Sequence, residues 1–95
     1  MMVVLGVDAH KRSHTIVACD EAGAQVGSIT VSATTEGHLR AVKWAAQWET
    51  WKWAIEDCRH ISRRLEADLL ASGELVVRVP PTVSYTHLRA HETVL

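Results

Sequence analysis

The sequence predicts an α/β domain with a mixed sheet, in the order β-β-β-α-β-α-β. Residues 2–32 hold three apolar or alternating segments separated by turn residues, a pattern typical of an antiparallel meander. Beyond residue 33, apolar residues recur at helical spacing in two segments, and a short strand-like run follows each of them. The 95 residues contain no internal repeat, and this length fits one small domain or part of a larger one.

Three strands are expected in the first third of the chain. Residues 2–8 form a continuous apolar run that ends in an acid, which is typical of a strand buried on both faces. A polar connection over residues 9–13 leads to a second strand at residues 14–20, which is rich in β-branched side chains. After a turn at residues 22–24, the alternating residues 25–32 predict a third strand.

A helix is expected to begin at Thr34 or Thr35, because either hydroxyl can cap a helix and Glu36 is favourable in the first turn. Its expected inner face is formed by three apolar residues at helical spacing: Leu39, Val42 and Ala46. Residues 52–56 then predict a short strand that ends in a second acid.

The last two expected elements are a helix at residues 60–72 and a strand at residues 75–79. Three apolar residues share one face of this helix: Ile61, Leu65 and Leu69. Gly73 is a natural helix stop, and the strand ends before Pro80, which cannot donate a hydrogen bond to a sheet.

Composition excludes several classes of protein. Apolar residues make up 47% of the chain, which is enough for a core and excludes a disordered tail. The net charge of −1 gives by itself no argument for nucleic-acid binding. No apolar stretch approaches the roughly 20 residues that a membrane helix needs, and no basic leader precedes the first apolar run. We therefore expect a cytoplasmic protein without membrane contact.

Asp8 and Glu56 are the candidate site residues because each of them ends a predicted strand. If the first and fourth strands are parallel neighbours, both carboxylates emerge at the same edge of the sheet, where ligand sites of α/β proteins gather. Carboxylate oxygens suit a hard cation such as Mg²⁺ or Mn²⁺, and a pair of such ions can activate a nucleophile against a phosphodiester. The spacing alone leaves a second interpretation open, in which these are two unrelated surface acids.

The sequence also resembles a known family along most of its length. The run Val4-Leu5-Gly6-Val7-Asp8-Ala9-His10-Lys11, followed by Thr15-Ile16-Val17-Ala18, is similar to the start of the DEDD-type insertion-sequence transposases. Later segments match in the same order: Thr35-Glu36-Gly37-His38-Leu39, Ala54-Ile55-Glu56-Asp57-Cys58, Ser62-Arg63-Arg64-Leu65-Glu66 and Val76-Val77-Arg78-Val79-Pro80-Pro81. The resemblance covers residues 2–81 and implies a ribonuclease-H-like (RuvC-like) fold, here as an incomplete domain.

The resemblance implies catalytic and metal-binding roles for Asp8 and Glu56, which match the first two of the family's four acids. Mg²⁺ or Mn²⁺ is then the expected cofactor and DNA the expected partner, with a guide RNA in some members and a homo-oligomer for the intact protein. Asp57 follows Glu56 directly and should point to the opposite face of its strand. The family's remaining Asp pair would lie beyond residue 95, so these residues alone are expected to be inactive.

Residues 82–95 are expected to form a separate, irregular tail. The family continues after the proline pair with a basic segment, whereas this chain reads Val-Ser-Tyr-Thr-His-Leu-Arg-Ala-His-Glu-Thr. That string resembles a tail found on unrelated conceptual translations, so we expect residues 1–81 to be the native, N-terminal part of a RuvC-like transposase domain. His87 and His91 have the i, i+4 spacing of a zinc-binding pair, but no third ligand is evident in the sequence.

Several basic residues are candidates for contacting nucleic acid. Lys11 and Arg12 follow the acid of the first strand and could steer a phosphate backbone. His10 beside them could touch a phosphate or hydrogen-bond an acid, or it could be an exposed loop residue. Arg59 and Arg63 belong to a basic group at the start of the second helix. A solvated surface is the alternative interpretation of these charges.

The aromatic residues and the remaining histidines have simpler interpretations. The four tryptophans could stack on bases, but a hydrophobic seam between helix and sheet is the favoured interpretation: Trp44, Trp48, Trp51 and Trp53. His38 and His60 lie near helix starts and are expected to be solvated.

Two other function classes stay open. An actin-like or sugar-kinase-type nucleotide-binding half-domain shares the three-stranded start and the acid on the first strand. Such a domain usually has a glycine-rich phosphate turn there, whereas residues 9–13 contain no glycine. A non-catalytic interaction fragment is the third possibility, and the lack of the downstream acids supports it.

Overall fold

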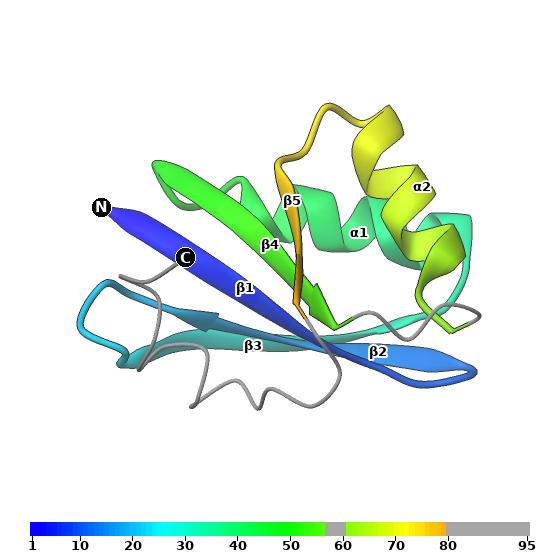
Figure 1. The fold of residues 1–95 in the computed structure, drawn as a ribbon, viewed down its shortest axis with the longest axis horizontal. Helices are drawn as coiled ribbons and strands as arrows, with labels where there is room; N and C mark the ends of the chain where they lie inside the picture. The colour runs from blue at the N-terminus through cyan, green and yellow to red at the C-terminus, as the bar shows by residue number, and fades with distance from the viewer. Residues whose placement is uncertain (57–60, 80–95) are drawn as a thin grey trace.

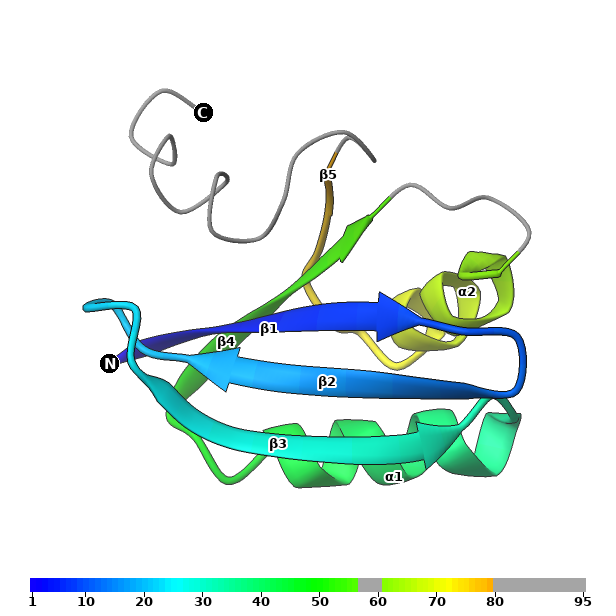
Figure 2. The ribbon, with the colours of Figure 1, turned by 90° about the horizontal axis from the view of Figure 1, so that it is seen from below.

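Five strands form one mixed sheet in the computed structural model, which describes residues 1–56 and 61–79. Their bounds are β1 Met2–Ala9, β2 Ser13–Cys19, β3 Gln25–Ser32, β4 Thr50–Glu56 and β5 Val76–Val79. The strands lie in the order β3-β2-β1-β4-β5 (Figure 2). The pairs β1–β2 and β2–β3 are antiparallel, whereas β1–β4 and β4–β5 are parallel. The predicted fold class, meander and order of elements are therefore confirmed.

Two helices, α1 at Thr35–Ala45 and α2 at Arg63–Ala71, pack on the same face of the sheet (Figure 1). Thr34 caps α1 as predicted, because its Oγ1 accepts a hydrogen bond from the Gly37 amide at 3.1 Å. α2 is followed by Ser72 and then Gly73, whose positive φ of 79° is a conformation that glycine adopts without strain. The predicted stop signal is thereby confirmed.

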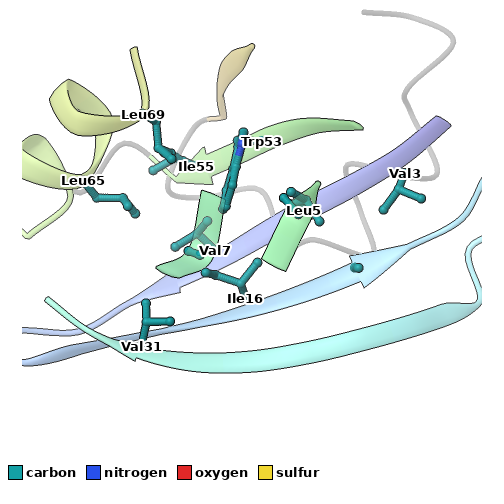
Figure 3. Close-up of a cluster of buried hydrophobic side chains, with 12 residues drawn as sticks. Val3, Leu5, Val7, Ile16, Val31, Trp53, Ile55, Leu65 and Leu69 are labelled. Atoms are coloured by element: carbon teal, nitrogen blue, oxygen red, sulfur yellow. The ribbon is translucent and has the colours of Figure 1, made fainter. Parts of the chain in front are cut away.

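The core lies between these helices and the sheet (Figure 3). Side chains of a strand alternate between its two faces, so every second residue of β1 points into the core. Val3, Leu5 and Val7 are at most 9% exposed, whereas Val4 and Gly6 on the other face are only half-buried. The expectation that residues 2–8 are buried on both faces is therefore wrong, because both described helices cover the same face.

The inner face of α1 differs from the predicted one. Its buried residues are small or polar rather than large and apolar: Gly37, His38, Ala41 and Ala45. Leu39, expected inside, is 48% exposed, Ala46 is also exposed, and only Val42 packs against the core. Small residues let a helix lie close to its neighbours, and this close approach decides which side of α1 faces inward. Ile61, expected on the inner face of the second helix, precedes α2 and is 43% exposed.

The predicted hydrophobic seam of tryptophans is confirmed. Trp53 is fully buried, and the three others are partly buried against the core: Trp44, Trp48 and Trp51. The Trp44 and Trp48 rings meet edge to face with centroids 4.8 Å apart. The indole Nε1 atoms of Trp51 and Trp53 both donate to Oε1 of Glu74, at 2.7 and 2.8 Å, which ties β4 to the segment before β5.

Some predictions fall on residues outside the described ranges. They are the tail at residues 82–95 with His87 and His91, and the candidates Asp57, Arg59 and His60. Neither helix within residues 1–56 and 61–79 has the length and apolar character needed to cross a bilayer.

Candidate functional site

Asp8 and Glu56 lie at the carboxyl ends of two neighbouring parallel strands. The register of β1 and β4 runs from Met2 opposite Thr50 to Val7 opposite Ile55. One further step places Asp8 beside Glu56. Because side chains alternate, both acids lie on the sheet face opposite the helices. The parallel pairing of the first and fourth strands, the condition on which the expected site depends, is met. This part of the sheet is called the acid edge below.

A row of hydroxyl groups continues from the acid edge across the sheet. Asp8 lies opposite Thr15 on β2, and Thr15 lies opposite Thr30 on β3. The two threonine Oγ1 atoms are 3.1 Å apart and share a hydrogen bond. Nothing in the sequence alone marks these threonines, although the alternation of β2 and β3 places both on the Asp8 face once the register is known.

His10 contacts the first acid directly. Its Nε2 lies 3.1 Å from Oδ2 of Asp8, and the two side chains are 60% and 72% exposed. His10 is therefore an exposed loop residue that also hydrogen-bonds an acid, and its contact with a phosphate stays a prediction. The contact leaves Oδ1 of Asp8 outside this hydrogen bond, so a cation could approach the carboxylate from that side.

The turn between β1 and β2 presents two cationic side chains next to the acid edge. Lys11 and Arg12 are both exposed. The turn is held by the His10 amide, which donates to the Ser13 carbonyl at 2.9 Å, and by the Ala33 amide, which donates to the Arg12 carbonyl at 2.9 Å. The positive charges are therefore carried by a turn whose backbone is fixed at two points.

Arg63 is the first residue of α2 and is exposed. Both views show the start of α2 at the same end of the sheet as the β1–β2 turn (Figures 1 and 2). The structure thus brings Arg63 to the same end of the molecule as Lys11 and Arg12, whereas Arg59 lies outside the described residues.

The donor set of the acid edge fits a hard divalent cation. Two carboxylates on adjacent strands supply the oxygen ligands that Mg²⁺ and Mn²⁺ prefer. Within residues 1–56 and 61–79, no group of three or more His, Cys, Asp or Glu side chains is arranged to hold a metal ion.

The opposite face of the sheet holds a second, buried group of polar side chains. His14 on β2 and His38 on α1 are each only 1% exposed, so the expectation that His38 is solvated is wrong. The physical reason is the close approach of α1, which turns His38 inward toward Asp68 on α2. His38 Nδ1 lies 2.6 Å from Oδ2 of Asp68, and this hydrogen bond lowers the pKa of the Asp68 carboxyl.

An exposed ion pair supports the outer strand. Nε and Nη2 of Arg78 on β5 donate to the two carboxylate oxygens of Glu66 on α2, each at 2.6 Å. This bidentate contact lowers the pKa of Glu66, mainly through the hydrogen bonds. It ties α2 to β5.

Comparison with known proteins identifies the family. No curated protein sequence matches the chain significantly. The model of the IS110-type DEDD family, described as transposase, matches residues 5–93 and so includes both Asp8 and Glu56. The match also includes residues 82–93, so it marks no boundary at residue 81, and the non-native origin of the tail stays a prediction.

The family match agrees with the architecture. The five-stranded mixed sheet with two helices in the described residues is the ribonuclease-H-like (RuvC-like) arrangement that the family resemblance implies. The match covers nearly the whole chain, from the second half of β1 to beyond β5. This chain therefore belongs to the IS110-type DEDD transposase family.

Proposed function

We propose that Asp8 and Glu56 hold Mg²⁺ or Mn²⁺ at the catalytic centre of a transposase that recombines DNA. The observation that supports this most strongly is the arrangement of two strand-terminal acids on the same face of neighbouring parallel strands. Members of the family generally use a divalent metal, and family membership implies DNA as the partner. The direct test is a titration with Mn²⁺ of the wild-type chain and an Asp8→Asn variant.

Each residue at the acid edge would have its own role in binding the metal ion and the DNA. A bound divalent ion would act as a Lewis acid toward a phosphodiester. Asp8 lies on the open side of the site, because its side chain is 72% exposed to solvent. A DNA strand would approach the site from this side. His10 would orient the Asp8 carboxylate through their hydrogen bond, and the Thr15 hydroxyl would border the site on the β2 side.

DNA would lie along the β1–β2 turn and the start of α2. Phosphate contacts by basic side chains position a nucleic acid without reading its sequence, which suits exposed cations around a phosphodiester site. Lys11 and Arg12 are the principal candidates, with His10, Arg59 and Arg63 as further contacts.

Replacing both turn cations, as Lys11→Gln with Arg12→Gln, is expected to weaken DNA binding and to reduce its salt dependence. The logarithm of the DNA-binding constant falls linearly with the logarithm of the salt concentration, and each phosphate contact that is lost makes this slope shallower by about 0.9. The measurement is fluorescence anisotropy of a labelled DNA duplex at several salt concentrations, without added metal.

The matched control is Arg40→Gln with Lys43→Gln, which removes the same charge from exposed positions of α1. We expect the control to keep the wild-type slope. Equal slopes for both double variants would show that the turn makes no phosphate contact and that any binding reflects net charge alone.

Several finer features belong to the same proposal. The intact transposase would act in the cytoplasm as a homo-oligomer, with a guide RNA as a further possible partner.

The 95 residues by themselves are expected to lack activity, because two carboxylates cannot fix the geometry that two-metal phosphoryl transfer requires. A nucleotide-binding half-domain is the less favoured alternative, since the turn at residues 9–13 offers no glycine-rich phosphate cradle.

A further inference from the structure

Two stacked histidines join the sheet to its helical layer. The rings of His14 on β2 and His38 on α1 have centroids 5.4 Å apart and planes inclined by 27°. Each side chain is 1% exposed. His14 pairs in the sheet with Ala9, the residue after Asp8, so the stack lies directly behind the acid edge. Imidazoles this deeply buried need a structural or functional reason.

The hydrogen bonds of the stack are incomplete. His38 Nδ1 donates to the Asp68 carboxylate, so this nitrogen carries a proton. Within residues 1–56 and 61–79, neither Nε2 of His38 nor Nδ1 of His14 has a hydrogen-bond partner, although both atoms are buried. Buried polar atoms are rarely left in this state, and each instance asks for an explanation.

A proton added to His14 would place a positive charge in this closed space. The groups that face His14 are His38 on α1 and His10 in the turn, and beyond His38 lie Asp68 and Arg64 on α2. The one carboxylate in this set, Asp68, is already bound to His38. A charged His14 would therefore be desolvated without a direct counter-ion among the described residues, which strongly disfavours the charged form.

We propose that the His14–His38 stack is a pH-sensitive lock between the sheet and the helical layer. While His14 is neutral, its ring packs against His38 and α1 and α2 stay docked. When His14 takes up a proton, the charged ring leaves the stack for water, and the contacts of α1 and α2 with the sheet loosen. The lock involves only the buried stack and does not depend on a metal at the acid edge.

The direction of the pH effect follows from the pKa of His14. Burial, with smaller contributions from His38 and His10, lowers this pKa below its usual 6.5. At pH values between the lowered pKa of His14 in the folded protein and its usual pKa of 6.5, the unfolded chain binds more protons than the folded one. Raising the pH in this range therefore favours folding. The stability contributed by the neutral, buried His14 is fully present above pH 6.5 and is lost as the pH falls below that value. Asp68 and Glu66, whose folded pKa values are below 3.8 and 4.5, lose their contributions only at lower pH.

A metal ion is a poorer explanation of the stack. Structural zinc sites take four protein ligands, and the stack offers two free ring nitrogens. If zinc were the occupant, Zn²⁺ would raise the melting temperature of the wild type but not of a variant without His14.

The test compares melting temperatures at about pH 8 and about pH 5 by circular dichroism, the range over which histidines titrate. The wild type is expected to melt several degrees lower at the acidic pH, and His14→Leu is expected to show a much smaller drop. Ser28→Ala, at an exposed position of β3, is the control that should keep the wild-type drop. Equal drops in wild type and His14→Leu would overturn the proposal, as would stabilisation of the wild type alone by Zn²⁺.

A second measurement avoids the risk that His14→Leu does not fold. In the wild-type protein, NMR titration of the histidine ring signals should show His14 titrating below pH 6.5, together with faster amide exchange in α1 and α2 over the same pH range. A His14 ring that titrates at or above 6.5, or helices whose exchange does not follow its protonation, would contradict the lock.

Discussion

Trp53→Ala is expected to destabilise the fold by about 3–5 kcal/mol, the loss typical of deleting a large buried aromatic side chain. Trp53 is the largest fully buried side chain and lies in the core beside Leu5, its register partner on β1. Its removal leaves a cavity between the sheet and the helices. It also removes one of the two indole donors that hold Glu74. A domain of this size has only about 5–15 kcal/mol of total stability, so a loss of this size is a large fraction of it.

The measurement is urea unfolding followed by far-ultraviolet circular dichroism. Trp53→Phe is the matched control, because it keeps an aromatic ring in the core and loses the five-membered ring with its N–H, while Trp51 still donates to Glu74. We expect the phenylalanine variant to lose clearly less stability than the alanine variant. A loss below about 0.5 kcal/mol for Trp53→Ala, the range of ordinary surface changes, would show that the core is not organised around this side chain.

Gly37→Ala is expected to destabilise the protein although Gly37 lies in a helix. Helix propensity alone predicts a gain of about 1 kcal/mol for this change. The added methyl group, however, would overlap the main-chain carbonyl oxygen of Ser32 and lie 2.6 Å from its Oγ. Because the obstacle is backbone, α1 has to shift away from the end of β3, and overpacking of this kind costs about 1–3 kcal/mol or more. A loss of stability would therefore show that overpacking against Ser32 outweighs helix propensity, and a gain would show the reverse.

Thermal unfolding of Gly37→Ala and Glu36→Ala provides the comparison. Glu36 is exposed in the same helical turn, so its replacement tests alanine in the turn without the contact to Ser32. We expect a loss of about 4–8 °C in melting temperature for each kcal/mol of destabilisation by Gly37→Ala, and little change for Glu36→Ala. If Gly37→Ala proved as stable as the wild type or more so, α1 could not lie as close to β3 as the structure has it.

The sequence was sufficient to predict the sheet and the acid edge. The continuous run that ends in Asp8 and the short run that ends in Glu56 are signals within single strands, and the short connections before residue 33 allow little besides a meander. The parallel pairing of β1 with β4 then brings the two acids together. Predicting that Asp8 and Glu56 lie together needed only the expectation that β1 and β4 are neighbours.

The features that the sequence analysis missed depend on packing between distant elements. The inner face of α1 was assigned to Leu39 and Ala46 because large apolar side chains are usually buried. The structure instead buries Gly37, where the helix lies too close to the end of β3 for a side chain, and His38, which hydrogen-bonds to Asp68. The partner of His38, Asp68, is 30 residues away on another helix, and such a contact leaves no periodic signal in the sequence. The threonine row likewise becomes visible only when the strand register is known.

The central claim is that Asp8 and Glu56 bind one divalent cation together, and Mn²⁺ titration of isotope-labelled protein followed by NMR tests it most directly. We expect weak binding that broadens the amide signals around the carboxyl ends of β1 and β4 before any others. Asp8→Asn and Glu56→Gln should each abolish this broadening, while Glu36→Gln, which removes one exposed carboxylate from α1, should leave it intact. Broadening that persists unchanged in Asp8→Asn, or that first appears at another part of the chain, would contradict the account.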